Sequence, residues 1–114
     1  MRALNDTRRT VVAERVEEAA SLRARLRGLL GRDGLEPGTA LLIRPCSSIH
    51  SFFMRFTFDA AFLDGRGRVL HLVERMRPFR LSRWVPRARA VLELPAGALA
   101  RSGTRVGDVV RFEE

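Results

Sequence analysis

The sequence predicts a compact α+β domain, in which a mainly antiparallel β roll or barrel-like sheet of about six short strands carries two outer helices. Three observations predict this fold class. The chain has 114 residues, a length that suits one domain with its own core. Its mixture of 46% hydrophobic and 30% charged residues is that of an ordinary globular protein. Short β-branched and apolar runs outnumber helical patterns and do not alternate regularly with them, which favours antiparallel strands.

The N-terminal part is expected to contain a flexible end, a strand and a helix. Residues 1–9 are polar and are predicted to be flexible, so that one domain covers residues 10–114. Residues 10–16 read TVVAERV, a β-branched run that suits a strand. Residues 21–30 predict an amphipathic helix, because four leucines recur there at helical spacing. These leucines are Leu22, Leu26, Leu29 and Leu30.

The middle of the chain predicts a strand followed by a hairpin. Residues 39–44 form a short apolar run that Pro45 ends. Residues 51–64 are rich in phenylalanine and suit a strand. They lead into residues 64–67, Asp-Gly-Arg-Gly, which favour a tight hairpin turn because glycine accepts positive φ.

The return strand of this hairpin, residues 68–74, is predicted to be covered on both faces. Side chains alternate along a strand, so we expect Val69, His71 and Val73 to share one face. A lone histidine in such a place is more often a hydrogen-bonded core residue than part of a site.

The C-terminal part is predicted to contain a long loop, two strands and a short helix. Residues 75–87 include prolines and aromatic residues without a period, so they are expected to form an irregular loop of the kind that often binds ligands. Residues 90–94 predict another strand, and residues 106–112 predict the final one. Between them, Pro95 suits the first turn of a short helix over residues 95–103, with a glycine at its end.

The charge of the chain points to anionic partners. The net charge is +8, and all 21 basic residues are arginines. A strongly basic surface attracts phosphates, acidic polymers and anionic lipid head groups. A genome with GC-rich codons also produces arginine in place of lysine. The basicity is therefore explained either by codon bias or by a function that requires positive charge.

The sequence contains no signal for secretion or membrane insertion. Cys46 is the single cysteine, which excludes an intramolecular disulfide. The longest apolar stretches are far shorter than a membrane-spanning helix of about 20 residues. The N-terminus lacks the apolar segment that a signal peptide has. We therefore expect a cytoplasmic protein without membrane contact.

Five short motifs occur in order along the chain. They are residues 28–32 (GLLGR), 52–57 (FFMRFT), 58–64 (FDAAFLD), 91–97 (VLELPAG) and 103–108 (GTRVGD). In this order and spacing they resemble the motifs of the domain of unknown function 192 family, and the resemblance covers residues 10–112. It implies a small α+β fold. It implies no activity, because the family name records none and a fold alone does not assign a function.

The chain departs from the family pattern at one place. Many members carry Trp-Met followed by Lys-Asn-Thr where residues 53–57 read Phe-Met-Arg-Phe-Thr. The position of the usual asparagine is therefore Phe56. If that amide serves a ligand in other members, this chain lacks the role or performs it differently.

The segment from Cys46 to Met54 is the sharpest candidate for a site. Cys46, His50 and Met54 recur at every fourth residue, which places them on one face of a strand or a helix. Thiolate, imidazole and thioether groups suit a soft metal ion such as Cu(I) or, less well, Zn²⁺. Cys46 and His50 also suit a nucleophile and its base. The structural alternative is that all three line a core or a ligand pocket.

Two acidic residues and an arginine complete this candidate pocket. A carboxylate at Asp59, in a Phe-rich strand, is costly unless it is paired, so we expect a salt bridge to Arg55 or another arginine, or a pocket carboxylate with a shifted pKa. Glu93 interrupts an apolar strand, where it faces water, caps backbone amides or serves a ligand. The predicted ligand-binding residues are Cys46, His50, Met54, Arg55, Asp59 and Glu93.

Residues 75–89 offer an alternative binding surface. Arginines beside aromatic residues are what single-stranded nucleic acid uses, through phosphate pairing and base stacking. The same loop suits an anionic sugar or a phosphorylated small molecule. The structural alternative is a solvated loop that Phe79 and Trp84 pin to the core. The residues of the nucleic-acid alternative are Arg75, Arg77, Arg80, Arg83 and Trp84.

Together these patterns favour a small ligand-binding or accessory domain with a cleft for a polar or anionic ligand. A basic nucleic-acid-associated protein is one alternative, and a small enzyme or metal-binding protein that uses Cys46 and His50 is another. The sequence lacks a phosphate-binding loop, a dinucleotide fingerprint and a nucleophile elbow. Catalysis is therefore the less favoured class, and no cofactor is expected.

Overall fold

A computed structural model describes residues 1–20, 33–52 and 54–114 of the chain. Strands dominate the described residues. The strands are β1 (Arg2–Asn5), β2 (Thr10–Ala13), β3 (Arg15–Ala19), β4 (Thr39–Ile43), β5 (Phe58–Leu63), β6 (Val69–Met76), β7 (Ala90–Pro95) and β8 (Val110–Glu113), and the helix is α2 (Ala98–Ser102). The predicted strands around residues 39–44, 68–74 and 90–94 are confirmed, and so is the hairpin that joins β5 to β6.

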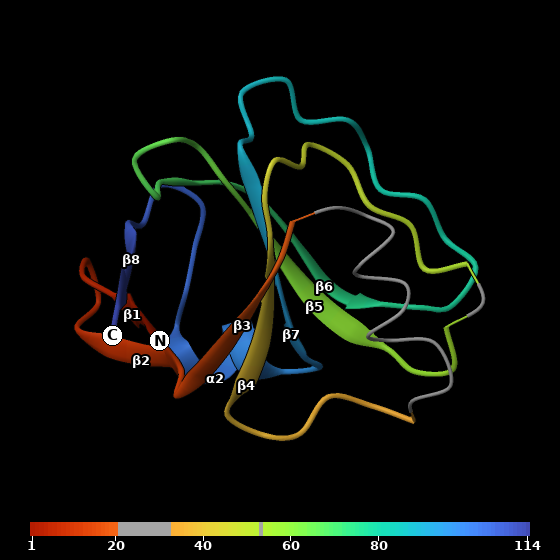
Figure 1. The fold of residues 1–114 in the computed structure, drawn as a ribbon, viewed down its shortest axis with the longest axis horizontal. Coiled ribbons are helices and arrows are strands. Elements are labelled where there is room, and N and C mark those ends of the chain that lie inside the picture. Colours follow the sequence, from red (N-terminus) through yellow and green to blue (C-terminus); the bar gives the residue numbers. More distant parts are fainter. Residues whose placement is uncertain (21–32, 53) are drawn as a thin grey trace.

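The described strands form two open sheets (Figure 1). The smaller sheet has the antiparallel order β2-β1-β8, and the larger one has the order β3-β4-β7-β5-β6. Only the β3–β4 pair is parallel; the other neighbours are antiparallel. The prediction of mainly antiparallel pairing is confirmed. The prediction of one barrel-like roll is wrong, because the described strands separate into two sheets instead of closing on themselves.

The chain passes from the smaller sheet into the larger one at Glu14, between β2 and β3. The backbone N–H groups of Glu14 and Arg15 both donate to the carbonyl oxygen of Gly38, at 2.8 and 3.0 Å. The predicted single strand over residues 10–16 is therefore two strands, β2 and β3. A continuous β-branched run gives no sign of such a bend, because both halves suit a strand equally well.

The N-terminus is the central strand of the smaller sheet. β1 pairs with β2 on one side and with β8 on the other, and Ala3 and Asn5 are fully buried. The prediction of a flexible segment over residues 1–9 is thus wrong for Arg2–Asn5. The short run RALN carries no local strand signal, and its order comes from pairing with the far end of the chain.

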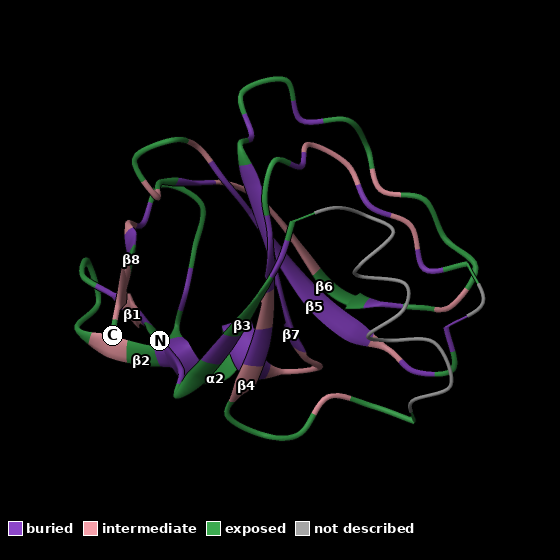
Figure 2. Ribbon diagram, in the orientation of Figure 1, coloured by how far each residue is buried: buried purple, intermediate pink, exposed green. Residues whose placement is uncertain are grey.

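The strands β5 and β7 of the larger sheet are buried on both faces (Figure 2). One hydrophobic cluster lies between the two sheets and includes Ala3, Leu42, Leu63, Leu92, Leu99 and Val110. The other lies on the opposite face, and it includes Ile43, Cys46, Met54, Phe62, Met76 and Val91. We call them the inter-sheet cluster and the loop-side cluster. Because side chains alternate along a strand, neighbouring residues of β5 or β7 enter different cores.

A register shift changes which residues of β6 share a face. Phe62 pairs with His71, whereas the next residue of β5, Leu63, pairs with Val69. Val69 therefore joins the inter-sheet cluster, while Val73 packs against the loop-side cluster. The predicted common face of Val69, His71 and Val73 is wrong for Val69, because a bulge adds a residue to one strand.

One of the two predicted outer helices is seen, in a shorter form. The helix predicted over residues 95–103 is α2, and Gly103 ends it in the left-handed conformation that glycine accepts, with φ 69°. The helix predicted over residues 21–30 lies outside the described residues. Across the residues that the structure does describe, no helix has the length and apolar character needed to cross a membrane.

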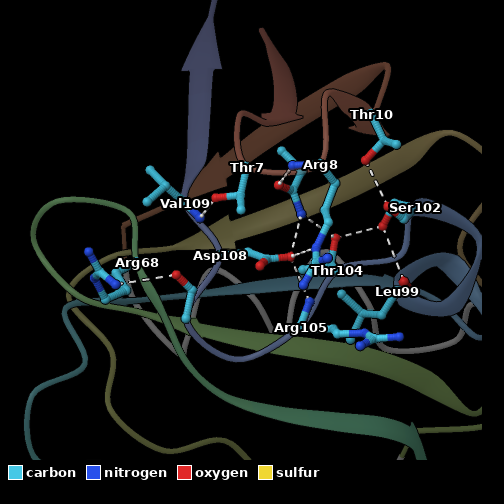
Figure 3. Close-up of polar contacts among 12 residues, drawn as sticks. Thr7, Arg8, Thr10, Arg68, Leu99, Ser102, Thr104, Arg105, Asp108 and Val109 are labelled. Atoms are coloured by element: carbon cyan, nitrogen blue, oxygen red, sulfur yellow. Dashed lines mark hydrogen bonds and ion pairs between the residues drawn. The ribbon is translucent and has the colours of Figure 1, made fainter.

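A buried polar cluster joins the two ends of the chain (Figure 3). Asn5 donates from Nδ2 to Thr104 Oγ1 at 3.1 Å and to Asp108 Oδ2 at 3.0 Å. The same oxygen of Asp108 accepts hydrogen bonds from Nε of Arg8 at 3.0 Å and from the backbone N–H of Arg105 at 2.9 Å. A buried carboxylate with several donors is well satisfied, so this cluster stabilises the fold.

The polar cluster extends to α2 and β2. The hydroxyl oxygens of Ser102 and Thr104 lie 2.7 Å apart, and the hydroxyl of Thr10 donates to the backbone oxygen of Ser102 at 2.7 Å. The motif at residues 103–108 therefore has a structural role, since it binds the N-terminal strands to the C-terminal part of the chain.

Candidate functional site

Among the described residues, the two carboxylates of the predicted pocket lie on opposite faces of the larger sheet. Glu93 of β7 pairs with Ala60 of β5, so both side chains are on the face of the loop-side cluster. Asp59, one residue before Ala60, points into the inter-sheet side instead. The predicted ligand-binding set therefore divides between two cores.

Asp59 anchors the backbone of two other elements. It is fully buried, and its Oδ1 accepts a hydrogen bond from the N–H of Arg75 at 2.9 Å. Its Oδ2 accepts the N–H groups of Gly97 and Leu99, each at 3.1 Å. Gly97 caps α2 without a side chain of its own, so the carboxylate from β5 caps this helix.

The arginine side chain predicted to pair with Asp59 lies elsewhere. Arg55 is exposed, and its guanidinium approaches the exposed carboxylate of Asp33 at 3.9 Å. The expected salt bridge between Asp59 and Arg55 is therefore wrong. Backbone amides supply the compensation that a buried carboxylate requires, which the sequence does not reveal because they come from distant segments.

Glu93 is also fully buried, which excludes the interpretation that it faces water. It lies at the centre of β7, between Leu41 of β4 and Ala60 of β5. Its side chain belongs with the loop-side cluster, the same core that contains Cys46 and Met54. Glu93 is therefore part of the interior beneath the two loops described below.

Cys46, His50 and Met54 lie in the loop segment between β4 and β5, not on one face of a regular strand or helix. Cys46 is 8% exposed and its thiol donates to the backbone oxygen of Ser48 at 3.1 Å. His50 is half-buried, and its Nδ1 accepts the N–H of Phe52 at 3.3 Å. Among the described residues there is no group of three or more His, Cys, Asp or Glu side chains that would hold a metal ion. The burial of the thiol also disfavours a role as nucleophile.

Two loops, residues 46–52 and 77–85, run side by side and are joined through Ser51 (Figure 1). Ser51 is fully buried. Its hydroxyl accepts the N–H of Arg80 at 2.9 Å and donates to the backbone oxygen of Arg77. Further backbone hydrogen bonds join Ser82 to Ile49 and Val85 to Ser47. The second loop is therefore held in a defined shape.

The loop of residues 77–85 and the end of β6 form a groove of about 370 Å³. We call it the arginine groove, and its lining residues are Val73, Arg75, Met76, Arg77, Arg80, Leu81, Ser82 and Arg83. All four arginines are exposed, and none of them forms an ion pair with a carboxylate in the part of the chain that is described. Unneutralised guanidinium groups gathered in one concave place produce a strongly positive potential.

The backbone of the groove is held in an uncommon conformation at two positions. Arg75 and Phe79 have φ of 54° and 60°, in the left-handed region that residues other than glycine seldom adopt. Such positions persist when surrounding contacts fix them, and they concentrate at functional sites. Two contacts fix these positions here. The carboxylate of Asp59 accepts the N–H of Arg75, and the backbone carbonyl oxygen of Ser51 accepts the N–H of Phe79 at 2.9 Å.

The positive field of the groove reaches the neighbouring strand. Burial lowers the pKa of His71, and the charge of Arg83 lowers it further. The ring of His71 lies 5.5 Å from that of Phe62, between their centroids. His71 therefore remains neutral at ordinary pH and packs as a core residue, as its place in a strand predicts.

Large apolar side chains surround the groove and remain open to solvent. The exposed fractions are 57% for Phe79, 70% for Leu81 and 66% for Trp84. The interpretation that Phe79 and Trp84 pin the loop to the core is therefore wrong. The buried Ser51 holds the loop instead. No local pattern identifies this residue beyond its place before a Phe-rich run.

Three comparisons connect this chain with known proteins. The family model DUF192, described as Uncharacterized ACR, matches residues 3–112. A UPF0127 protein of Thermococcus sibiricus is 31% identical over 116 residues, which cover 96% of this chain and 73% of that protein. A UPF0127 protein of Pyrococcus horikoshii is 35% identical over 68 residues, with 58% of this chain and 56% of that one covered.

Two crystal structures are similar in fold. A protein of unknown function from Novosphingobium aromaticivorans superposes with a TM-score of 0.75 and 22% identity, over 85% of this chain and 74% of that one. A candidate transcription regulator from Sinorhizobium meliloti also has a TM-score of 0.75, with 24% identity over 96% of this chain and 89% of that one. At such identities the likeness establishes the fold alone.

Proposed function

This chain belongs to the DUF192 family of uncharacterised proteins, and within that family we propose that it is a small binding domain whose arginine groove takes an anionic ligand. The observation that carries the proposal is the set of four arginines on one groove without an acidic partner among the described residues. Guanidinium groups bind phosphate and carboxylate oxygens through paired hydrogen bonds.

The size and lining of the groove favour a small phosphorylated or carboxylated molecule. A volume of about 370 Å³ lies within the range of small-molecule sites. Val73, Met76 and Leu81 supply apolar surface beside the charges. Asp59 supports this site through its hydrogen bond to the N–H of Arg75. Cys46 and Met54 belong to the loop-side cluster, which also contains the groove residue Met76.

A titration with phosphate-containing probes tests the proposal. Isothermal titration calorimetry with pyrophosphate and with a ribonucleoside monophosphate measures binding to the unmodified protein. The variant R77Q/R80Q/R83Q removes three groove charges and is expected to raise Kd by about tenfold or more. The variant R9Q/R15Q/R105Q removes three exposed charges elsewhere and is expected to leave Kd within about twofold. Equal affinity in both variants would contradict the proposal.

A second candidate function is binding of single-stranded nucleic acid at the same loop. The observation that favours it is the exposure of Trp84 and Phe79 beside the arginines, because bases stack on aromatic rings while guanidinium groups pair with phosphates. Fluorescence anisotropy with oligo-dT and oligo-U at about 50 and about 200 mM salt tests it. Steep salt dependence and loss of affinity in W84A support the function, and no binding at the lower salt concentration excludes it.

A further inference from the structure

A second arginine-lined cleft lies at the other end of the β5–β6 hairpin from the arginine groove. It occupies the space between the hairpin turn at residues 64–67, the start of β7 and β8, and has a volume of about 530 Å³. An adjoining cavity of about 550 Å³ shares part of its wall. We call it the hairpin cleft; the residues common to both cavities are Asp64, Gly65, Arg66, Arg89 and Val109.

The floor of the hairpin cleft is apolar and belongs to both sheets. Leu42 and Leu63 come from the larger sheet, and Val110 comes from the smaller one. All three are at most 3% exposed and belong to the inter-sheet cluster. The cleft therefore opens on hydrophobic core, which suits the apolar or aromatic body of a ligand.

The rim of the cleft carries two kinds of arginine. Arg44 is paired with Glu18, and Arg111 is paired with Asp6 at 3.0 Å. Arg66 and Arg89 form no ion pair within the described ranges of the chain.

The acidic residue of the turn, Asp64, forms no ion pair with these two arginines among the described residues, although the charge of Arg66 helps to lower its pKa. Oδ1 of Asp64 accepts the backbone N–H groups of Arg66 and Arg68, both at 2.9 Å. That arrangement closes the turn and leaves the guanidinium groups of Arg66 and Arg89 outside any ion pair with the carboxylate. An anion at the rim would therefore meet positive charge first.

The turn that carries Arg66 is held firmly in place. A methyl group on Gly67 would lie 2.2 Å from the carbonyl oxygen of Val110, so the turn packs directly on β8. The N–H of Arg89 donates to the oxygen of Leu63 at 2.7 Å, and its Cγ lies 3.8 Å from the position of a methyl group on Gly65. The two arginines thus flank the same turn on a fixed backbone.

We propose that the hairpin cleft binds an amphipathic organic anion, with its apolar body on Leu42, Leu63 and Val110 and its charged group between Arg66 and Arg89. The charged group is a carboxylate, a sulfonate or a phosphate ester, because each presents oxygens that guanidinium groups pair with. This site is separate from the arginine groove and does not depend on the function proposed for it.

The fluorescent probe 8-anilinonaphthalene-1-sulfonate tests the proposal directly, because it combines an aromatic body with one negative charge. Binding of the probe to the intact protein is followed by its blue-shifted emission. Decanoate is expected to displace it, whereas inorganic phosphate, which lacks an apolar body, and decanol, which lacks a charge, are expected to be at least about tenfold weaker competitors. Equal competition by decanol would overturn the assignment of an anion.

Two variants locate the probe. R66Q/R89Q is expected to raise the Kd of the probe by about tenfold, while R66K/R89K, which keeps both charges, is expected to recover most of the affinity. R77Q/R80Q removes the same number of charges from the arginine groove and is expected to change nothing. Circular dichroism and thermal unfolding confirm that each variant is folded. Wild-type affinity in R66Q/R89Q, or no binding by the intact protein, would overturn the proposal.

Backbone NMR separates this site from the groove. With the probe present, we expect amide shift changes at residues 63–68, 89–90 and 109–112 and none at residues 75–83. The opposite distribution would overturn the proposal while it supported the arginine groove. Loss of pyrophosphate binding in R77Q/R80Q/R83Q, by contrast, concerns the groove alone.

Discussion

Asn5 and Asp108 are 103 positions apart in the chain, and Nδ2 of the one lies 3.0 Å from Oδ2 of the other. Both side chains are at most 3% exposed. The contact joins the last residue of β1 to the segment before β8, so that the N-terminal and C-terminal strands share one polar cluster. The conformation of the C-terminal motif is therefore tied to that of the N-terminus.

The first prediction concerns acid stability. Burial raises the pKa of Asp108, but Arg8, Asn5 and the N–H of Arg105 together hold it below its ordinary value. The stabilisation by the carboxylate is thus present above the unfolded pKa of about 3.9 and is lost as the pH falls through the lower folded pKa. We expect D108N to cost about 2 kcal/mol of unfolding free energy at pH 7.

Urea unfolding between pH 7 and pH 2 checks this prediction. We expect the unfolding free energy of D108N to fall less steeply below pH 4 than that of the unmodified protein. Asp64 and Glu113, whose pKa values are also lowered, account for the slope that remains. Parallel curves for the two proteins would show that Asp108 does not carry the acid sensitivity.

The second prediction concerns Asp59. Its removal in D59A leaves the N–H groups of Arg75, Gly97 and Leu99 without their acceptor in the interior. We expect a loss of about 3 kcal/mol, measured by guanidinium unfolding. D33A removes an exposed carboxylate with a distant partner and is expected to cost no more than about 0.5 kcal/mol. Similar losses in both variants would rule out the anchoring role.

The third prediction concerns the hairpin turn. G67A places a methyl group 2.2 Å from the carbonyl oxygen of Val110 at a φ of 85°. Both the contact and the left-handed backbone oppose it, and we expect a loss of about 2 kcal/mol or more in thermal or urea unfolding. G34A is the matched control, because nothing lies within 4 Å of its methyl group. A G67A protein as stable as G34A would contradict the close packing of the turn.

The fourth prediction concerns the contact between the two loops. S51A removes the hydroxyl that binds both Arg77 and Arg80. We expect local opening of the loop to become easier by about 1.4 kcal/mol, and trypsin to cleave after the loop arginines about tenfold faster. Mass spectrometry identifies the cleaved bonds. S47A, in the same loop, is expected to be cleaved at the wild-type rate, and an unchanged rate in S51A would exclude the role of the hydroxyl.

Local patterns predicted the elements that depend on local interactions. The β5–β6 hairpin follows from glycines in a turn between apolar runs, and its turn and return strand agree with those expected, whereas β5 begins only at Phe58 and not at residue 51. The short helix after Pro95 and its glycine end were also predicted, because cap residues act within one turn. The β1 strand was missed since its partners lie at the far end of the chain, and no local signal encodes such pairing.

In the candidate site, too, features that depend on local sequence were predicted and features that depend on long-range pairing were not. Composition alone predicted that the loop arginines form a binding surface, and Arg75, Arg77, Arg80 and Arg83 do line one groove. That this groove binds a ligand stays a prediction. The spacing of Cys46, His50 and Met54 suggested a shared face, but that inference requires a regular element, and these residues lie in a loop. The placement of Asp59 and Glu93 on opposite faces of the sheet depends on strand register, which the pairing between β5 and β7 decides.

The central place of β1 in the smaller sheet sets the order in which a newly made chain can fold. Arg2 pairs with Glu113, which the ribosome adds 111 residues later. During translation β1 can meet β2 at once, but its second edge stays open until β8 has been synthesised. The exposed edge is a site for wrong pairing with other chains for that whole period. Completion of the smaller sheet therefore has to wait for the synthesis of β8, and the rate of chain elongation bounds how early the inter-sheet cluster can close.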